Sequence, residues 1–389
     1  MKLENKTLNK KDYKPLNKNK LSNKKFNLKS IIIIIGIICI FILLLFIRNN
    51  NKNNITTNRQ FILSKKTDKS NQIDVEFFNE LKKILKEDII KENEMMDSHT
   101  TFKIGGPAKY FIKPRSVDQI IEIINLCNKH KVNYFILGNG SNLLVSDEGY
   151  YGVVINIHEN NFSNIEVKKE DEKNYLVKVG GGILMKTLAI ELCLLSLTGL
   201  EDIIDIPGTV GGGIIMNASF HSNALIKHLL KVKVITPEGI LKELNKDECG
   251  FILRGSLLKD KKYLVVEATF KLKMGNKIVI QKTMTDNTKN RYEKQPMYFG
   301  SAGCFFVWNH GKHGSMYEKY KENNLVSYQV GNAMIYTYNI AFIVNLGKAK
   351  ASDVMAIVTH IEKVMKEKYK IEMRREVVTI GSFNGINYY

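Results

Sequence analysis

Apolar residues recur with both helical and strand periods beyond residue 72, and this alternation predicts a mixed architecture. A capping box at 116–119 precedes apolar residues at helical spacing from Ile120 to Cys127, so a helix is predicted to run to about His130. Further helices are predicted over residues 184–195 and from Ser352. Strands are predicted over residues 134–137, 152–157, 163–180 (a hairpin), 231–235, 263–271, 302–307, 341–344 and 376–380.

The order of these elements predicts the fold class. Helices and strands alternate with no sustained heptad pattern and no internal repeat, which argues against a coiled coil or a solenoid. The predicted class is α+β. No pattern in the sequence indicates an oligomeric state.

The first 72 residues differ from the rest. Residues 31–47, "IIIIIGIICIFILLLFI", are 17 consecutive apolar residues, at the lower limit for crossing a bilayer. The long preceding segment and the lack of a small-residue cleavage site argue against a signal peptide. The sequence therefore predicts a basic tail over 1–30, a transmembrane anchor over 31–47 and a polar tether over 48–72. Lys and Arg number 7 in residues 11–30 and 5 in residues 48–67, which sets the orientation only weakly.

Charge and metal-ligating residues exclude two classes of function. The net charge is +19, but residues 1–70 hold 16 Lys and Arg against 3 Asp and Glu. The remaining body is only mildly basic, so nucleic acid is not an expected partner. Five cysteines without CxxC spacing and eight histidines without ligand spacing predict no metal site.

Three glycine-rich segments supply the candidate binding chemistry: "IGG" at 104–106, "GNGSN" at 138–142 and "IPGTVGGG" at 206–213. Unhindered backbone N–H groups in such segments converge on anions, and three together suggest one extended pyrophosphate. No GxGxxG occurs, so a dinucleotide on a non-Rossmann fold is predicted. A Gly211→Val change is expected to cost ligand occupancy more than folding. The predicted cofactor-binding residues are Gly105, Gly138, Asn139, Gly140, Ser141, Asn142, Pro207, Gly208, Thr209, Gly211 and Gly212.

Seven segments, in this order and at this spacing, carry a family resemblance. They are "HTTFKIGGPAKYF", "LGNGSNLLVSDEGYYGVVI", "GLEDIIDIPGTVGGGIIMNA", "FILRGS", "RYEKQPMYFGSAGCFF", "FIVN" and "EVVTIG". From about His99 to Gly381 the chain resembles UDP-N-acetylenolpyruvoylglucosamine reductase, in the shorter, second type of that family. The first seventy residues lie outside the resemblance.

The resemblance implies a PCMH-like FAD-binding module of two subdomains over 73–280 and a C-terminal α+β substrate-binding domain over 290–389. It implies FAD and NADPH as cofactors and a nucleotide sugar as substrate, in peptidoglycan synthesis. Because nucleotide sugars and NADPH are cytoplasmic, a membrane-anchored protein of this kind is expected to face the cytoplasm with its body.

The resemblance also implies three catalytic residues. Cys304 stands where the family has its proton donor, and Arg254 where the substrate carboxylate and the developing enolate are stabilised. Glu376 stands where an acid assists that charge. A fixed guanidinium suits a developing negative charge, and a thiol is a weak acid suited to proton donation.

Several positions depart from the family pattern. They are Val307 and its neighbours Trp308 and Asn309, Leu253 before the key arginine, and Asn339 in place of a histidine. These positions are expected on the substrate side. They leave two alternatives to the reductase: a flavin oxidoreductase of the same fold with another substrate, or a catalytically decayed, membrane-tethered flavoprotein.

Overall fold

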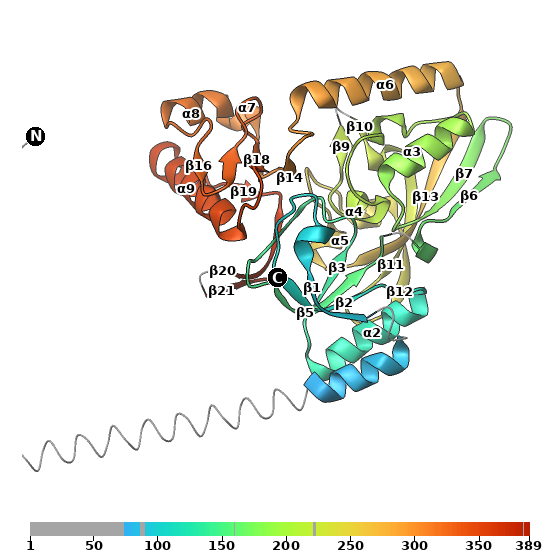
Figure 1. Ribbon diagram of the computed structural model, residues 1–389. Helices are drawn as coiled ribbons and strands as arrows, with labels where there is room; N and C mark the ends of the chain where they lie inside the picture. The colour runs from blue at the N-terminus through green and yellow to red at the C-terminus, as the bar shows by residue number, and fades with distance from the viewer. Residues whose placement is uncertain (1–73, 86–89, 159, 221–222, 384) are drawn as a thin grey trace, which may run out of the picture. The chain divides into compact units, whose positions relative to one another are not determined.

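The computed structural model describes residues 74–85, 90–158, 160–220, 223–383 and 385–389 (Figure 1). These residues belong to one compact unit that runs to Tyr389. The predicted tail, anchor and tether, at 1–30, 31–47 and 48–72, lie outside the described residues.

The first sheet is built around three parallel strands. Strand β5 pairs in parallel with β2 and with β3, and β1 pairs antiparallel with β2 at the edge. Helix α2 (Val117–His130) begins where Ser116 Oγ accepts a hydrogen bond from the N–H of Gln119 at 3.2 Å, which confirms the predicted N-terminal cap. Its apolar face and a helix over residues 74–84 share one core beside this sheet. The bounds are β1 Ile90–Met95, β2 Pro107–Ile112, β3 Tyr134–Leu137 and β5 Tyr150–Asn156.

The second sheet is antiparallel, in the order β12-β11-β13-β7-β6, with β8 (Leu197–Thr198) also pairing with β13. Helices α3 (Met185–Leu194) and α4 (Val210–Ile215) contribute Leu188 and Val210 to the core that this sheet shares. The bounds are β6 Ile165–Lys169, β7 Asn174–Gly180, β11 Leu229–Ile235, β12 Leu241–Asn245 and β13 Leu264–Met274.

A third sheet belongs to the last third of the chain. It has the order β14-β18-β17-β16, and the long helix α9 (Ala351–Tyr369) buries Val354, Ile357 and Ile361 in the adjoining core. The helices α7 and α8 lie in the same region, drawn in orange and red in Figure 1. The bounds are β14 Gly300–Cys304, β16 Gln329–Val330, β17 Ala333–Ile335, β18 Phe342–Asn345, α7 His310–His313 and α8 Met316–Glu322.

Two features tie the last third to the first half. Strand β20 (Val378–Phe383) pairs in parallel with β4 (Leu143–Val145) and carries β21 (Ile386–Tyr388) on its other edge. Asp147, just after β4, accepts hydrogen bonds from the N–H groups of Ala351 and Ser352 at 2.7 and 2.9 Å. These amides begin α9, so a side chain from the first half caps a helix of the last third.

Most of the predicted elements are confirmed, with shifts of a few residues at their ends. The predicted strand over 302–307 is interrupted at Phe305, between β14 and β15 (Phe306–Val307), and β15 pairs with β19 (Arg374–Arg375). Several elements were not predicted, among them β21 and the helix α6 (Lys277–Lys294). Helix α6 buries only Ile280, Asn287 and Arg291, so it lacks the apolar stripe by which an amphipathic helix is recognised. The shorter elements are β9 Ser219–Phe220, β10 Asn223–Ala224 and α5 Leu257–Asp260.

Candidate active site

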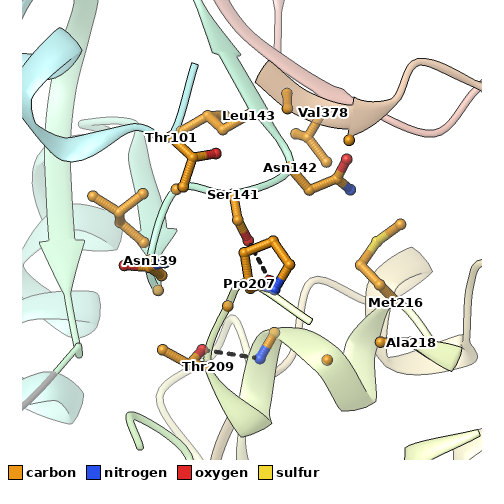
Figure 2. Close-up of a pocket in the computed structure, with 18 of the residues that line it drawn as sticks. Thr101, Asn139, Ser141, Asn142, Leu143, Pro207, Thr209, Met216, Ala218 and Val378 are labelled. Atoms are coloured by element: carbon orange, nitrogen blue, oxygen red, sulfur yellow. Dashed lines mark hydrogen bonds between the residues drawn. The ribbon is translucent and has the colours of Figure 1, made fainter. Parts of the chain in front are cut away.

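A cavity of about 1080 Å³ receives residues from all three sheets and from the loops between them. Two of the three glycine-rich segments line it: residues 138–142, which follow β3, and residues 206–213, which lead into α4. Figure 2 shows Ser141 and Pro207 facing each other, and Ser141 Oγ donates a hydrogen bond to the carbonyl of Pro207 at 2.8 Å. This bond joins two segments that are distant in sequence at one wall of the cavity.

The segment 138–142 presents backbone donors that the protein itself does not use. Gly140 has a φ of +62°, and a Cβ there would lie 2.1 Å from the carbonyl oxygen of His99, so only glycine fits. Among the described residues, none accepts a hydrogen bond from the amides of Gly138 to Asn142. Backbone N–H groups require partners, so these amides are available to a ligand anion.

The segment 206–213 supplies the second part of the same wall. Gly208 has a φ of +131°, and a Cβ there would lie 2.9 Å from Ser141 Oγ. Thr209 caps α4 by accepting a hydrogen bond from the Gly212 N–H at 3.3 Å. Within the described part of the chain, the amides of Gly208 and Thr209 likewise donate to no protein acceptor. Both segments therefore fit a phosphate-bearing ligand.

Two of the predicted glycines pack closely against the protein itself, although Gly211 also lines the cavity. Gly105 does not line the cavity, and a Cβ there would meet the side chains of Met96 and Val145 at 2.9 and 3.0 Å. A Cβ on Gly211 would lie 2.8 Å from the carbonyl oxygen of Val265 and 2.9 Å from that of Gly181. The expectation that Gly211→Val costs ligand occupancy more than folding is therefore wrong, because the nearest obstacle is the protein's own backbone.

Arg254, Cys304 and Glu376 all line the same cavity. Arg254 stands in a turn before α5 with a φ of +55°, a conformation that is uncommon for a residue with a side chain. Its Nε lies 3.4 Å from Glu376 Oε1, and its Nη1 lies 3.2 Å from Ser219 Oγ. The guanidinium is thus held in a fixed direction by two neighbours.

Cys304 ends β14 and is partly buried. The pKa of its thiol is raised to about 11, mainly by burial and also by the nearby Glu376 carboxylate, while Arg254 and Arg291 oppose the shift. The thiol therefore keeps its proton at neutral pH. These mutual effects show that the three residues share one electrostatic environment.

Glu376 stands between β19 and β20. Burial raises the pKa of its carboxyl group, against the opposing effect of Arg254 first and then of Lys259 and Arg374. Asn142 donates a hydrogen bond from Nδ2 to the backbone carbonyl of Glu376 at 3.1 Å. The segment with the unused amides is therefore joined directly to a candidate catalytic residue.

Sequence reasoning missed several charged residues of the cavity, and two of them act on the candidate catalytic residues. Arg291, on the buried face of α6, lines the cavity and interacts electrostatically with Cys304 and Asp205, and burial lowers its pKa. Lys259, on α5, also lines the cavity, and burial lowers its pKa too. Arg291 lies inside the quoted segment "RYEKQPMYF", but nothing local distinguishes it from the surface charges around it.

The positions that depart from the family pattern lie elsewhere. Leu253, Val307 and Asn339 are not among the residues that line the cavity. Leu253 is 60% exposed, Val307 pairs with Arg374 between strands, and Asn339 Nδ2 donates to the carbonyl of Lys294 at 2.9 Å. Their expected place on the substrate side stays a prediction.

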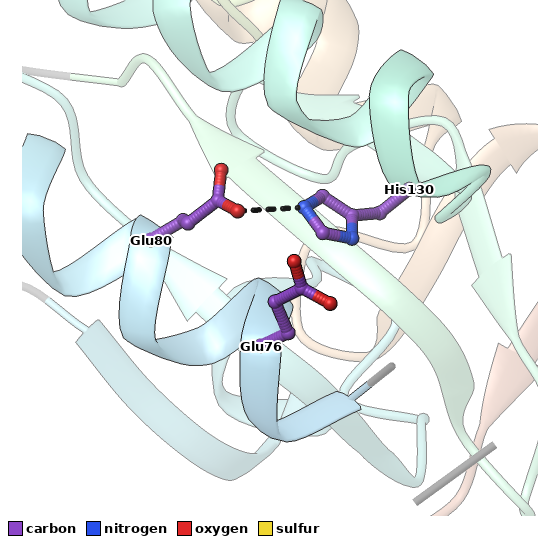
Figure 3. A group of neighbouring side chains, drawn as sticks. All are labelled: Glu76, Glu80 and His130. Atoms are coloured by element: carbon purple, nitrogen blue, oxygen red, sulfur yellow. Dashed lines mark hydrogen bonds and ion pairs between the residues drawn. The ribbon is translucent and has the colours of Figure 1, made fainter. Parts of the chain in front are cut away.

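One group of side chains outside the cavity has the composition of a metal site. Glu76, Glu80 and His130 place their ligand atoms within 4.8 Å of one another (Figure 3). Lys129 Nζ lies 2.8 Å from both carboxylate oxygens of Glu80, and His130 Nε2 lies 3.3 Å from one of them. A lysine cation on this carboxylate competes with a metal, and the contacts describe an ion-pair network.

Comparison with known proteins gives consistent matches. The family described as "FAD binding domain" matches residues 108–245, and that described as "UDP-N-acetylenolpyruvoylglucosamine reductase, C-terminal domain" matches residues 295–380. The UDP-N-acetylenolpyruvoylglucosamine reductase of Bacillus pumilus is 38% identical over 297 residues, 76% of this chain and 95% of that protein. That of Lachnoclostridium phytofermentans is 34% identical over 302 residues, 78% of this chain and 96% of that protein.

A solved structure agrees with these matches. The UDP-N-acetylenolpyruvylglucosamine reductase of Thermus caldophilus superposes with a TM-score of 0.61 at 31% identity, covering 74% of this chain and 97% of that one. The predicted class, an α+β fold with a PCMH-like FAD-binding module and a C-terminal α+β domain, is confirmed.

The predicted membrane-anchored localisation is wrong on these comparisons. About three quarters of this chain account for nearly the whole length of the relatives, so what is shared is the enzymatic body. Within the residues that the structure describes, every helix is too short or too polar to span a bilayer. Residues 31–47, on which the prediction rested, lie outside the described residues.

Proposed function

Because the chain belongs to the UDP-N-acetylenolpyruvoylglucosamine reductase family, we propose that its cavity holds FAD with the reacting end beside Arg254, Cys304 and Glu376. The protein is an FAD-dependent oxidoreductase that uses NADPH. It reduces the enolpyruvyl group of UDP-N-acetylglucosamine enolpyruvate to give UDP-N-acetylmuramate for peptidoglycan synthesis.

The residues present fit this cofactor. A pyrophosphate needs several convergent donors, and the amides of 138–142, Gly208 and Thr209 have no protein acceptor within the described residues. Side chains at Gly140 and Gly208 would obstruct the wall that these amides form. We assign Gly138, Asn139, Gly140, Ser141, Asn142, Pro207, Gly208, Thr209 and Gly212 to FAD binding.

When bound at this cavity, FAD would supply the hydride, received from NADPH, that the methylene carbon of the enolpyruvyl group requires. Arg254 binds the substrate carboxylate and meets the negative charge that develops on it as the enolate forms. A guanidinium that is held by Glu376 and Ser219 requires little reorganisation in the transition state.

Cys304 gives its thiol proton to the carbon next to the carboxylate. With a pKa of about 11, the thiol carries this proton throughout the neutral range. Arg254 and Arg291 lower the pKa of this thiol, so the same two cations stabilise the thiolate that remains. A solvent proton restores the thiol.

Glu376, next to Arg254, helps to stabilise the negative charge that develops on the substrate. Its raised pKa increases the fraction of the neutral acid, which donates a hydrogen bond to an anion where a carboxylate would repel it. The position beside Cys304 supports this role, whereas the ion pair with Arg254 lowers the pKa of Glu376 and favours the carboxylate.

The domain boundaries are part of the proposal. We assign residues 73–280 to FAD binding and residues 290–389 to substrate binding. The matches at 108–245 and 295–380 support this division. Strand β20 pairs with β4, and its return to the FAD-binding part brings Glu376 to the cavity.

The observation that carries the proposal is the meeting of Arg254, Cys304 and Glu376 at a cavity whose lining also presents unused amides. The test is to purify the full chain, record its flavin absorbance, and add NADPH and then the enolpyruvyl nucleotide. Bleaching by NADPH followed by recovery with the nucleotide is expected. A colourless folded protein that takes up no FAD would contradict the proposal, and bleaching without recovery would indicate another substrate.

A further inference from the structure

The hairpin of β20 and β21 extends beyond the part of the chain that matches the family. The matched C-terminal domain ends at residue 380, whereas β21 spans Ile386–Tyr388 and pairs back onto β20, with Tyr388 opposite Gly381. Figure 1 places this hairpin beside the C end of the chain. The hairpin therefore positions the residue that follows it, Tyr389, and Tyr389 lines the cavity.

Tyr389 is held against two other cavity residues. Its ring lies 4.9 Å from the ring of Phe135, centroid to centroid, at 78°. Lys262 Nζ lies 4.3 Å from the centroid of the Tyr389 ring. The residue is still 47% exposed, so the ring is positioned by its neighbours and retains surface for a ligand.

The chain itself gives the order of groups along the cavity. Residues 135–142 run from Phe135, which contacts Tyr389, through the unused amides of 138–141 to Asn142, which is bonded to Glu376. At the strand rise, Phe135 lies about 10 Å before Gly138. Tyr389 and the reacting residues are therefore at opposite ends of a segment whose middle suits a pyrophosphate.

A dinucleotide flavin has the same linear order: the isoalloxazine, the pyrophosphate and then the adenine. With the isoalloxazine beside Glu376 and the pyrophosphate on the amides, the adenine falls beside Phe135 and Tyr389. We propose that Tyr389 is a cofactor-binding residue whose ring stacks on the adenine of FAD. This inference rests on the proposed function, because it takes the position of the reacting end from it.

The chemistry of the group agrees with a purine ligand. Aromatic rings are effective stacking platforms for bases because every base presents a π face. Lys262 holds the Tyr389 ring through a cation–π contact. A ring fixed by Lys262 and Phe135 loses little freedom when the base binds.

The test compares FAD with FMN, which lacks the adenylate half. The apoprotein of the full chain and of Tyr389→Leu would be titrated with each flavin, and binding read from flavin fluorescence. Tyr389→Leu should raise the Kd for FAD by about 5- to 150-fold, the usual range for loss of a base-stacking ring, and leave the Kd for FMN unchanged. Tyr389→Phe should restore FAD binding.

Ile386→Ala is the matched control, because Ile386 lies on β21, just before Tyr389, and is 60% exposed; it should bind both flavins as the parent does. Equal weakening of FAD and FMN by Tyr389→Leu would overturn the inference, and so would unchanged or tighter FAD binding. Those results leave the proposed function intact. A parent protein that binds neither flavin would overturn both.

Discussion

Arg254 Nε lies 3.4 Å from Glu376 Oε1, with side chains that are 30% and 18% exposed. The two residues come from a turn before α5 and from the segment between β19 and β20, which the pairing of β20 with β4 brings to the cavity. Both residues also shift the pKa of Cys304, the proposed proton donor. The pair therefore connects the guanidinium that stabilises the enolate charge with the group that donates the proton. The first three predictions concern this group.

Cys304→Ala should slow reoxidation of the flavin by the enolpyruvyl substrate by about 10²- to 10⁴-fold, the usual effect of losing a positioned general acid. Reduction by NADPH should stay near the parental rate, because this half-reaction needs no proton from residue 304. Stopped-flow absorbance separates the two steps. Cys304→Ser should keep measurable turnover, and parental reoxidation in Cys304→Ala would show that another group donates the proton.

Cys304 should react slowly with iodoacetamide at pH 7.5 although it lines the cavity. Only the thiolate is alkylated, and a pKa of about 11 leaves a thiolate fraction about 10²-fold below that of an ordinary cysteine. Glu376→Gln removes a charge that raises this pKa, so alkylation should become faster. Peptide mass spectrometry of the flavin-free protein gives both rates, and a slower reaction in Glu376→Gln would contradict the electrostatic assignment.

Glu376→Gln should also change how stability depends on pH. The folded pKa of Glu376 is raised by burial, so between the ordinary carboxyl value of about 4.3 and this raised value the folded state binds more protons than the unfolded state. The free energy of unfolding therefore falls as pH rises through this window. Glu376→Gln has no carboxyl group at this position and so does not lose this stability. The free energy of unfolding of the variant minus that of the parent should therefore increase from pH 4 to neutrality. Urea denaturation at several pH values measures the difference; a difference that stays constant would count against the raised pKa.

Gly211→Ala and Gly212→Ala should separate folding from cofactor binding. A Cβ on Gly211 meets two backbone oxygens at 2.8 and 2.9 Å, whereas one on Gly212 meets only Thr209 Oγ1 at 3.3 Å. Gly211→Ala should therefore lower the free energy of unfolding by about 1–3 kcal/mol, as overpacking does. Gly212→Ala should keep the parental stability and weaken FAD binding, because its methyl group lies at the cavity wall.

Urea denaturation and flavin titration, run on both glycine variants, provide the measurements. Undiminished FAD affinity in Gly212→Ala would remove this residue from the cofactor site. If Gly211→Ala has the same free energy of unfolding as the parent, the backbone at residues 181 and 265 shifts to make room for the added methyl group.

Asp147→Ala should destabilise the protein by about 1 kcal/mol, the usual cost of losing a helix cap. Its carboxylate accepts from the first two amides of α9 at 2.7 and 2.9 Å and so joins the two proposed domains. Asp147→Asn retains one acceptor oxygen and should lose less. Urea denaturation of the flavin-free protein gives the values, and equal stability of all three proteins would mean that water caps α9 equally well.

The sequence by itself determined the elements whose signals are local. The capping box and the helical spacing after Ser116 predicted α2, and β3 was predicted with its bounds, because neighbouring residues decide these structures. The glycines at 138–142 and 206–213 indicated close backbone approaches, since glycine in such positions has few other uses. The seven family segments indicated the reductase, which the comparisons confirmed.

Only the tertiary structure decided which group lies close to each glycine. Gly208 lies against Ser141 at the cavity wall, whereas Gly211 packs on the backbone of Gly181 and Val265, although the two glycines stand three positions apart. It likewise revealed α6, whose buried residues are too few to leave an apolar stripe, and placed Tyr389 beside Phe135. These outcomes depend on contacts between distant segments, and no window of neighbouring residues contains the partner that decides them.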